Sequence, residues 1–305
     1  MQIGLSVTSA HPRGDAATSA RWVVERAAAA RAAGFASFSL GDHHATPRPY
    51  LQNVPMLARC LPELGEMRVI PLFLLPLWHP VLLAEQLGTL AAIAAGPLDC
   101  ILAVGDGEEQ FAPFGVPLSE RRDRMEEAVP LLRRLLTEER VTHEGRYWQL
   151  SDVTVSPRPP RSPRFWIGAS ARVAVRRAGR VGDGWLAAPG ATSAQLRDQL
   201  AWYREAADGE DRLAEVETFP IRRDVYIGAS DAEARATAAP IIERGYRGFD
   251  PEVLIVGGPE TAIARLRELE GMGFDHTLIR FLPVGQEAIL ESIARIGRDV
   301  IPALR

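Results

Sequence analysis

Apolar strand patterns and helical patterns alternate along almost the whole chain, and this alternation limits the folds that the sequence can adopt. The runs that we interpret as strands are Ile3–Val7, Phe35–Leu40, Arg68–Leu75, Leu98–Val104, Phe165–Ile167, Gly184–Ala187, Arg222–Ile227 and Thr277–Leu282. Each is followed by a helical pattern. We therefore predict one (β/α)8 barrel over residues 1–305, with insertions near 140–163 and 245–256. A doubly wound open sheet fits less well, because the segment after the first strand lacks a glycine-rich phosphate loop.

Charge and composition exclude several classes of function. The net charge of −4 gives no reason to expect a nucleic acid or an anionic membrane as partner. All 35 basic residues are arginine, which excludes Schiff-base lysine chemistry and leaves phosphate binding to Arg, hydroxyls or backbone amides. Cys60 and Cys100 stand alone, a usage typical of a reducing cytosol. Neither a signal peptide nor a membrane span is evident, so we expect a cytoplasmic protein.

The second strand run ends in a group of titratable residues. Asp42, His43 and His44 directly follow its glycine. Barrels of this class keep their chemistry at the C-terminal ends of strands, and His exchanges protons near neutral pH. The alternative is that these residues only cap or pack the strand end. A metal site is not expected, because adjacent imidazoles point apart and no second ligand pair follows.

Two further loops carry candidate residues. After the fourth strand, Gly105-Asp106-Gly107-Glu108 combines closely spaced glycines with acids above the predicted barrel mouth. After the fifth, Gly168-Ala-Ser-Ala-Arg172 leads directly into a helix, an arrangement that suits an anion at the helix N-terminus. The alternatives are a tight turn with solvated acids, and an ordinary helix cap by Ser170.

Three more residues are candidate substrate contacts. Arg280 lies within the last strand, where it must find either a neighbouring carboxylate or an anion in the site. His11 follows the first strand and could line the mouth, and His44 is the third candidate.

Read in order, these segments resemble the luciferase-like monooxygenase superfamily, which contains flavin-dependent monooxygenases and deazaflavin-dependent oxidoreductases. The matching landmarks are Leu40–His44, Pro76–Glu85, Val104–Phe111, Phe114–Val116, Arg121–Glu127, Glu144-Gly145, Phe165–Gly168, Ala178–Trp185 and Val256–Glu260. The set covers essentially the whole chain, and its order is specific although each piece alone is weak.

The resemblance implies a barrel that binds FMN or coenzyme F420 at its C-terminal mouth. It implies that Asp42 and His43 lie beside the ring with His43 as acid or base, and that Glu108 donates or orients a proton. It implies a supporting backbone step, often a cis peptide, at Leu72 and Phe73. The remaining implied cofactor contacts are Asp106 and Gly107 at the ring edge or tail, and Gly168, Ala169, Ser170, Ala171 and Arg172 at the phosphate.

Departures from the family pattern leave the cofactor open. Ala95-Gly-Pro97 replaces a usual Gly-Arg, Phe111 replaces a polar residue, and a phosphate-binding lysine is missing. We favour hydride transfer between F420 and a small organic substrate. The alternatives are an FMN monooxygenase supplied by a flavin reductase, a flavin-binding relative without turnover, and a phosphate-recognising isomerase or lyase without flavin. The apolar patterns at Val54–Leu64 and Val81–Ala94 predict a homodimer.

Overall fold

The computed structural model describes residues 1–12, 14–216 and 218–305, and eight parallel strands of these residues close into a barrel. In sheet order they are β9 (Pro220–Ile227), β11 (His276–Phe281), β1 (Gln2–Val7), β2 (Ser37–Leu40), β3 (Arg68–Leu74), β4 (Cys100–Ala103), β7 (Phe165–Ala169) and β8 (Gly184–Ala187). Ala187 of β8 pairs with Ile221 of β9 and closes the ring. The predicted (β/α)8 fold is confirmed.

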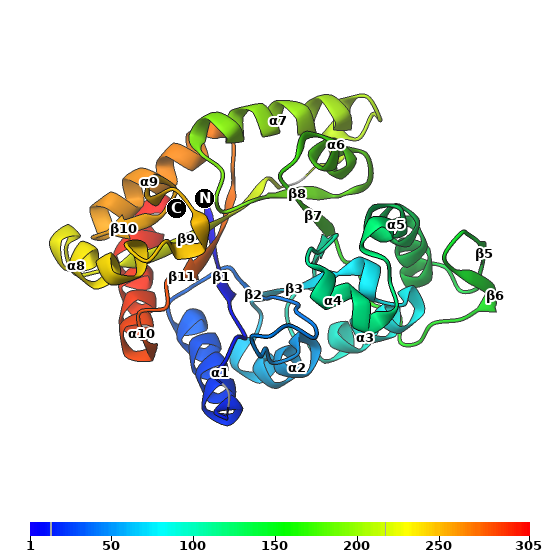
Figure 1. Cartoon of the computed structure of the whole chain (residues 1–305), viewed down its shortest axis with the longest axis horizontal. Helices are drawn as coiled ribbons and strands as arrows, with labels where there is room; N and C mark the ends of the chain where they lie inside the picture. The colour runs from blue at the N-terminus through cyan, green and yellow to red at the C-terminus, as the bar shows by residue number, and fades with distance from the viewer. Residues whose placement is uncertain (13, 217) are drawn as a thin grey trace.

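Helices surround the strands on the outside (Figure 1). They are α1 (Ala16–Ala32), α2 (Asn53–Leu64), α3 (Pro80–Ile93), α4 (Glu108–Phe111), α5 (Arg121–Thr137), α6 (Arg172–Val181), α7 (Ser193–Asp208), α8 (Asp231–Ile242), α9 (Pro259–Met272) and α10 (Gln286–Arg295). Local chemistry sets several starts: Thr192 and Gln195 form a capping box at α7, and Ser230 caps α8. No described helix is both long and apolar enough to cross a lipid bilayer.

The two segments expected as insertions have different structures. The first contains an antiparallel hairpin of β5 (Val141–Glu144) and β6 (Gln149–Val153). The second contains two short 3₁₀ turns, Tyr246–Gly248 and Pro251–Val253, and then β10 (Ile255–Gly257). The sequence pattern does not predict this strand. It pairs with the C-terminal half of β9, whereas β8 pairs with β9 nearer its start, at Ile221. In the segment before β10, Arg247 lines the cavity at the mouth of the barrel, and the Tyr246 hydroxyl donates a hydrogen bond to Asp224 of β9 at 2.8 Å.

Large side chains fill the inside of the barrel below the mouth. Ile70, Ile101, Trp166, Leu186 and Leu278 form one buried cluster from five different strands. His276, at the start of β11, is also buried, and its Nε2 lies 2.8 Å from the Ser37 hydroxyl. Burial lowers the pKa of His276 to about 3, so it is a neutral structural residue at the N-terminal end of the strands.

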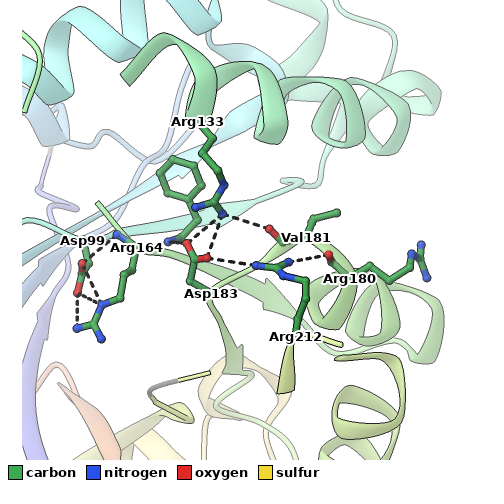
Figure 2. Close-up of polar contacts among 8 residues, drawn as sticks. Asp99, Arg133, Arg164, Arg180, Val181, Asp183 and Arg212 are labelled. Atoms are coloured by element: carbon green, nitrogen blue, oxygen red, sulfur yellow. Dashed lines mark hydrogen bonds and ion pairs between the residues drawn. The ribbon is translucent and has the colours of Figure 1, made fainter. Parts of the chain in front are cut away.

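Two carboxylates join segments at the same N-terminal end. Asp99, just before β4, accepts hydrogen bonds from the backbone and guanidinium of Arg164. Figure 2 shows Arg133 of α5 and Arg212 reaching Asp183, just before β8, from two sides. The distances are 3.0 Å and 3.3 Å, and Asp183 also accepts from the amide of Phe165 at 2.9 Å. These ion pairs stabilise the face opposite the mouth, where structural roles prevail in such barrels.

We expect Asp183→Ala to lower the free energy of unfolding by about 2–4 kcal/mol, because two guanidinium groups and one amide lose their acceptor. Asp123→Ala is the matched control: its exposed pair with Arg146 spans 3.5 Å, and its loss should change stability by about 0.5 kcal/mol or less. Urea denaturation of both variants measures the difference. Equal effects of the two substitutions would contradict the structural role of Asp183.

Candidate functional site

A cavity of about 490 Å³ opens at the C-terminal mouth of the barrel. The ends of β1, β2, β3, β4, β8, β9 and β11 contribute to its wall, and the loop after α8 contributes Arg247 and Phe249. Apolar side chains of the barrel interior, such as Ile101 and Leu278, lie on its inner side. The volume is in the range of small-molecule sites in enzymes.

His43 is half-buried on the wall of this cavity, and its ring lies 4.1 Å, centroid to centroid, from the ring of Tyr50. Gln52 fixes the backbone by donating a hydrogen bond to the His43 carbonyl at 3.1 Å. Burial is the main reason that the pKa of His43 falls to about 4, and the positive charge of Arg280 lowers it further. The imidazole is therefore neutral at pH 7 and can accept a proton.

Asp42 is buried and holds neighbouring segments in place. Its Oδ2 accepts hydrogen bonds from the amide of Leu74, at 2.9 Å, and from the indole of Trp78, at 2.8 Å. Its Oδ1 lies 2.9 Å from Nε2 of His44. Asp42 touches the cavity wall, but its oxygens already face these groups.

His44 is turned away from the cavity. Its ring packs edge-on against Trp78 and Phe114, with centroids 5.9 Å and 5.3 Å away. The prediction of His44 as a substrate contact receives no support, because His44 is not part of the cavity lining and its imidazole lies against Asp42, Trp78 and Phe114. His11 also lies off the cavity lining; its Nδ1 is 2.9 Å from the Pro12 carbonyl.

The end of β3 supports one wall of the cavity. Leu72 lines it, and the Leu72 carbonyl accepts a hydrogen bond from Asn53 at 2.6 Å. Phe73, next along the strand, points the other way and is fully buried. The expected cis peptide is wrong: among the described residues the only cis bond precedes Pro157, and the Leu72–Phe73 bond is trans. The β3 end is held by the hydrogen bond from Leu74 to Asp42 instead.

The loop after β4 lies at the rim. Asp106 and Glu108 are exposed, and Gly107, with a φ of +87°, precedes the short helix α4. None of the three is part of the cavity lining. The residue that sequence reasoning missed here is Gln110: it is buried, donates to the Asp106 carbonyl at 2.8 Å and accepts from the His44 amide at 3.2 Å. Gln110 thus joins this loop to the end of β2.

The predicted anion cradle lies beyond the cavity lining, at the end of β7. Gly168 and Ala169 close the strand, while Ser170, Ala171 and Arg172 are exposed. Helix α6 begins at Arg172, and its N-cap is Ala171, which has no side chain able to cap the first amides. The alternative in which Ser170 is the cap is therefore wrong. An uncapped helix start beside an arginine is a site that a phosphate group fits.

Among the residues that the structure describes, four arginines line the cavity. Arg48, Arg222, Arg247 and Arg280 all line the cavity, whereas sequence reasoning found only Arg280. Arg222 and Arg280 come from the paired strands β9 and β11, in which Arg280 is level with Asp224. A sequence signal existed: Arg222, Arg223 and Asp224 are three consecutive charged residues in an otherwise apolar strand, and alternation places Arg222 and Asp224 on one side of it.

With this geometry established, comparison with known proteins defines the family. The model of the luciferase-like monooxygenase family matches residues 1–276. The chain belongs to this family. It is 27% identical, over 93% of its length and 95% of the relative's, to an F420-dependent glucose-6-phosphate dehydrogenase of Intrasporangium calvum. It is 30% identical to an FMNH(2)-dependent dimethylsulfone monooxygenase of Pseudomonas putida, with 83% of this chain and 78% of that protein covered.

A solved structure supports the same fold. The monooxygenase RslO1 from Streptomyces bottropensis has a TM-score of 0.88 to this chain at 22% identity, and the match covers 100% of both chains. At this identity the likeness concerns the fold alone.

We expect His43 to titrate at about 4, well below its ordinary 6.5, in an NMR titration of the imidazole. Arg280→Gln should raise this pKa, because it removes a cation that disfavours the imidazolium. Since the folded-state pKa lies below the unfolded one, His43 contributes stability that is complete above pH 6.5 and is lost as the pH falls toward 4. His43→Gln should flatten that part of the stability profile. A His43 that titrates near 6.5 would contradict the burial argument.

Proposed function

We propose that this chain is an oxidoreductase that transfers a hydride between coenzyme F420 and a small organic substrate bound in the mouth cavity. The observation that supports this most directly is His43, a neutral imidazole held open to a cavity of about 490 Å³ by the fixed end of β2. Both named relatives reported above use a flavin or deazaflavin cofactor, as their names state.

The residues present fit such a cofactor. The uncapped start of α6 and the side chain of Arg172 suit its phosphate, and Gly168 leaves room, since an added Cβ would meet nothing closer than 3.8 Å. Leu72 offers an apolar surface for its ring on the β3 side of the cavity. When bound, the cofactor supplies the hydride acceptor or donor, which no side chain of this protein can provide.

The protein's own residues would handle the proton. His43, neutral at pH 7, would accept the proton of a substrate hydroxyl as that substrate is oxidised, and would return it in the reverse direction. Asp42 would position His43 by fixing the ends of β2 and β3 and would not exchange protons itself, since its oxygens face Leu74, Trp78 and His44. Glu108, with Asp106 and Gly107, would act from the rim, at the edge of a bound cofactor.

The second candidate is an FMN-dependent monooxygenase, which the relative in Pseudomonas putida favours. It would need a separate flavin reductase as partner and oxygen as co-substrate. Two weaker alternatives are a flavin-binding relative without turnover, and a phosphate-recognising isomerase or lyase. In each case the location would be the cytoplasm.

Fluorescence-quench titrations with F420 and FMN, side by side, test the proposal. We expect F420 to bind more tightly than FMN; the reverse order would favour the monooxygenase, and binding of neither would overturn both. His43→Gln should keep cofactor affinity while turnover falls by about 100-fold, because it removes the proton acceptor. The matched control is His143→Gln, which removes a histidine on the hairpin, outside the cavity. Wild-type turnover that is absent despite tight binding would favour the flavin-binding relative.

We further propose a homodimer built on α2 and α3. Leu82 and Ile93 of α3 are 48% and 56% exposed and would give a second copy of the chain an apolar surface to pack on. Light scattering after size exclusion should give twice the chain mass of 33.4 kDa at micromolar concentration. Leu82→Asp combined with Ile93→Asp should give the monomer. A wild-type monomer under these conditions would refute the proposal.

A further inference from the structure

The wall of the cavity formed by β9 and β11 carries more positive charge than the protein neutralises. Arg222 and Arg280 line the cavity from these paired strands, Arg247 lines it from the segment before β10, and Arg48 lines it from the loop after β2. Asp224 of β9, which is level with Arg280 of β11 behind this wall, is completely buried and is not part of the cavity lining.

Both carboxylate oxygens of Asp224 already accept hydrogen bonds from other residues. Its Oδ1 accepts from Nε of Arg222 at 3.2 Å, and its Oδ2 accepts from the Tyr246 hydroxyl at 2.8 Å. Arg247 approaches the same Oδ2 at 3.9 Å. One carboxylate therefore serves one tyrosine and two arginines before Arg280 is considered.

Arg280 has no acceptor of its own. In the part of the chain that the structure describes, neither a hydrogen bond nor an ion pair reaches its guanidinium, although Asp224 is its register partner across the strands. Its exposure is intermediate because it opens onto the cavity, yet the guanidinium is enclosed deeply enough that burial lowers its pKa. Nη2 of Arg222 is likewise buried without a partner.

Such an arrangement does not stabilise the empty protein. A guanidinium removed from water is destabilising unless an anion faces it, and the like charges of Arg222, Arg247 and Arg280 repel one another. Planar guanidinium groups that converge on one space are suited to a carboxylate, sulfonate or phosphate, which accept paired hydrogen bonds from them.

We propose that the substrate of this enzyme is an organic anion whose acidic group binds to Arg280 and Nη2 of Arg222, with Arg247 closing over it. The proposal rests on the proposed function for the reaction itself. His43 lines the same cavity, so an acid held by Arg280 would place the remainder of the molecule beside the imidazole. The cofactor's own phosphate is the other possible anion, but its predicted cradle at Gly168–Arg172 lies off this cavity.

The probe is inorganic phosphate, added to the full-length protein without cofactor. The line width of the ³¹P NMR signal measures its binding. Two variants are compared, Arg172→Gln alone and Arg172→Gln with Arg280→Gln. The shared Arg172→Gln substitution makes the predicted cofactor-phosphate site contribute little to the measured phosphate binding. Adding Arg280→Gln should weaken phosphate binding by about 10- to 100-fold, as expected for one lost charge-assisted pair. Arg197→Gln, on α7 and off the cavity, is the control and should leave the affinity unchanged.

Two further measurements separate the alternatives. Arg280→Gln alone should leave F420 and FMN affinities unchanged and should not lower the melting temperature, because it removes an unpaired charge. Equal losses of cofactor and phosphate affinity, or unchanged phosphate affinity, would overturn the proposal. If Arg280→Gln fails to fold, the substitution Arg247→Gln, at an exposed loop position, should still weaken phosphate binding. Phosphate affinity that is unchanged in Arg247→Gln would then overturn the proposal. Phosphate binding without F420 or FMN binding would reject the proposed function but not the anion site.

Discussion

The carboxylate of Asp42 joins three segments at the mouth of the barrel, and the position of His43 follows from that junction. Its two oxygens reach the amide of Leu74, the indole of Trp78 and the imidazole of His44. Burying a carboxylate is costly, and the two hydrogen bonds that Oδ2 accepts offset part of that cost by holding these segments together. Within the described residues Oδ1 accepts no hydrogen bond and has only the nearby imidazole of His44. His43, between Asp42 and His44 in the chain, lines the cavity.

The two ends of the barrel use the same residue types for different purposes. At the N-terminal end, Asp183 and Asp99 meet their arginines directly, and His276 is neutral against Ser37. At the C-terminal end, no carboxylate of the described residues forms an ion pair with Arg280, although Asp224 lies level with it. The matched pairs are expected to contribute stability, and the unpaired arginine is the group that the proposed anion site would use.

The sequence was sufficient for the features that depend on local pattern. The alternation of short apolar runs with helical patterns predicted all eight barrel strands, and the polar residues after the second run predicted the location of Asp42 and His43. The sequence was insufficient for features that depend on pairing between segments far apart in the chain. The three residues of β10 are too few for a periodic signal, and their pairing with β9 brings Arg247 to the mouth. Likewise, only the register of β9 with β11 shows that Asp224 is level with Arg280 and yet bound elsewhere.

Electrostatics couples the arginine wall to the proton acceptor. After burial, the charge of Arg280 is the next cause that lowers the pKa of His43, so the imidazole is a weak base while the wall is uncompensated. An anion bound at Arg280 would cancel part of that charge and raise the pKa of His43 toward the range in which general bases are effective. Substrate binding would then strengthen the base that the reaction requires. The excess of positive charge, costly in the empty protein, would thus make proton transfer depend on the presence of the anionic substrate.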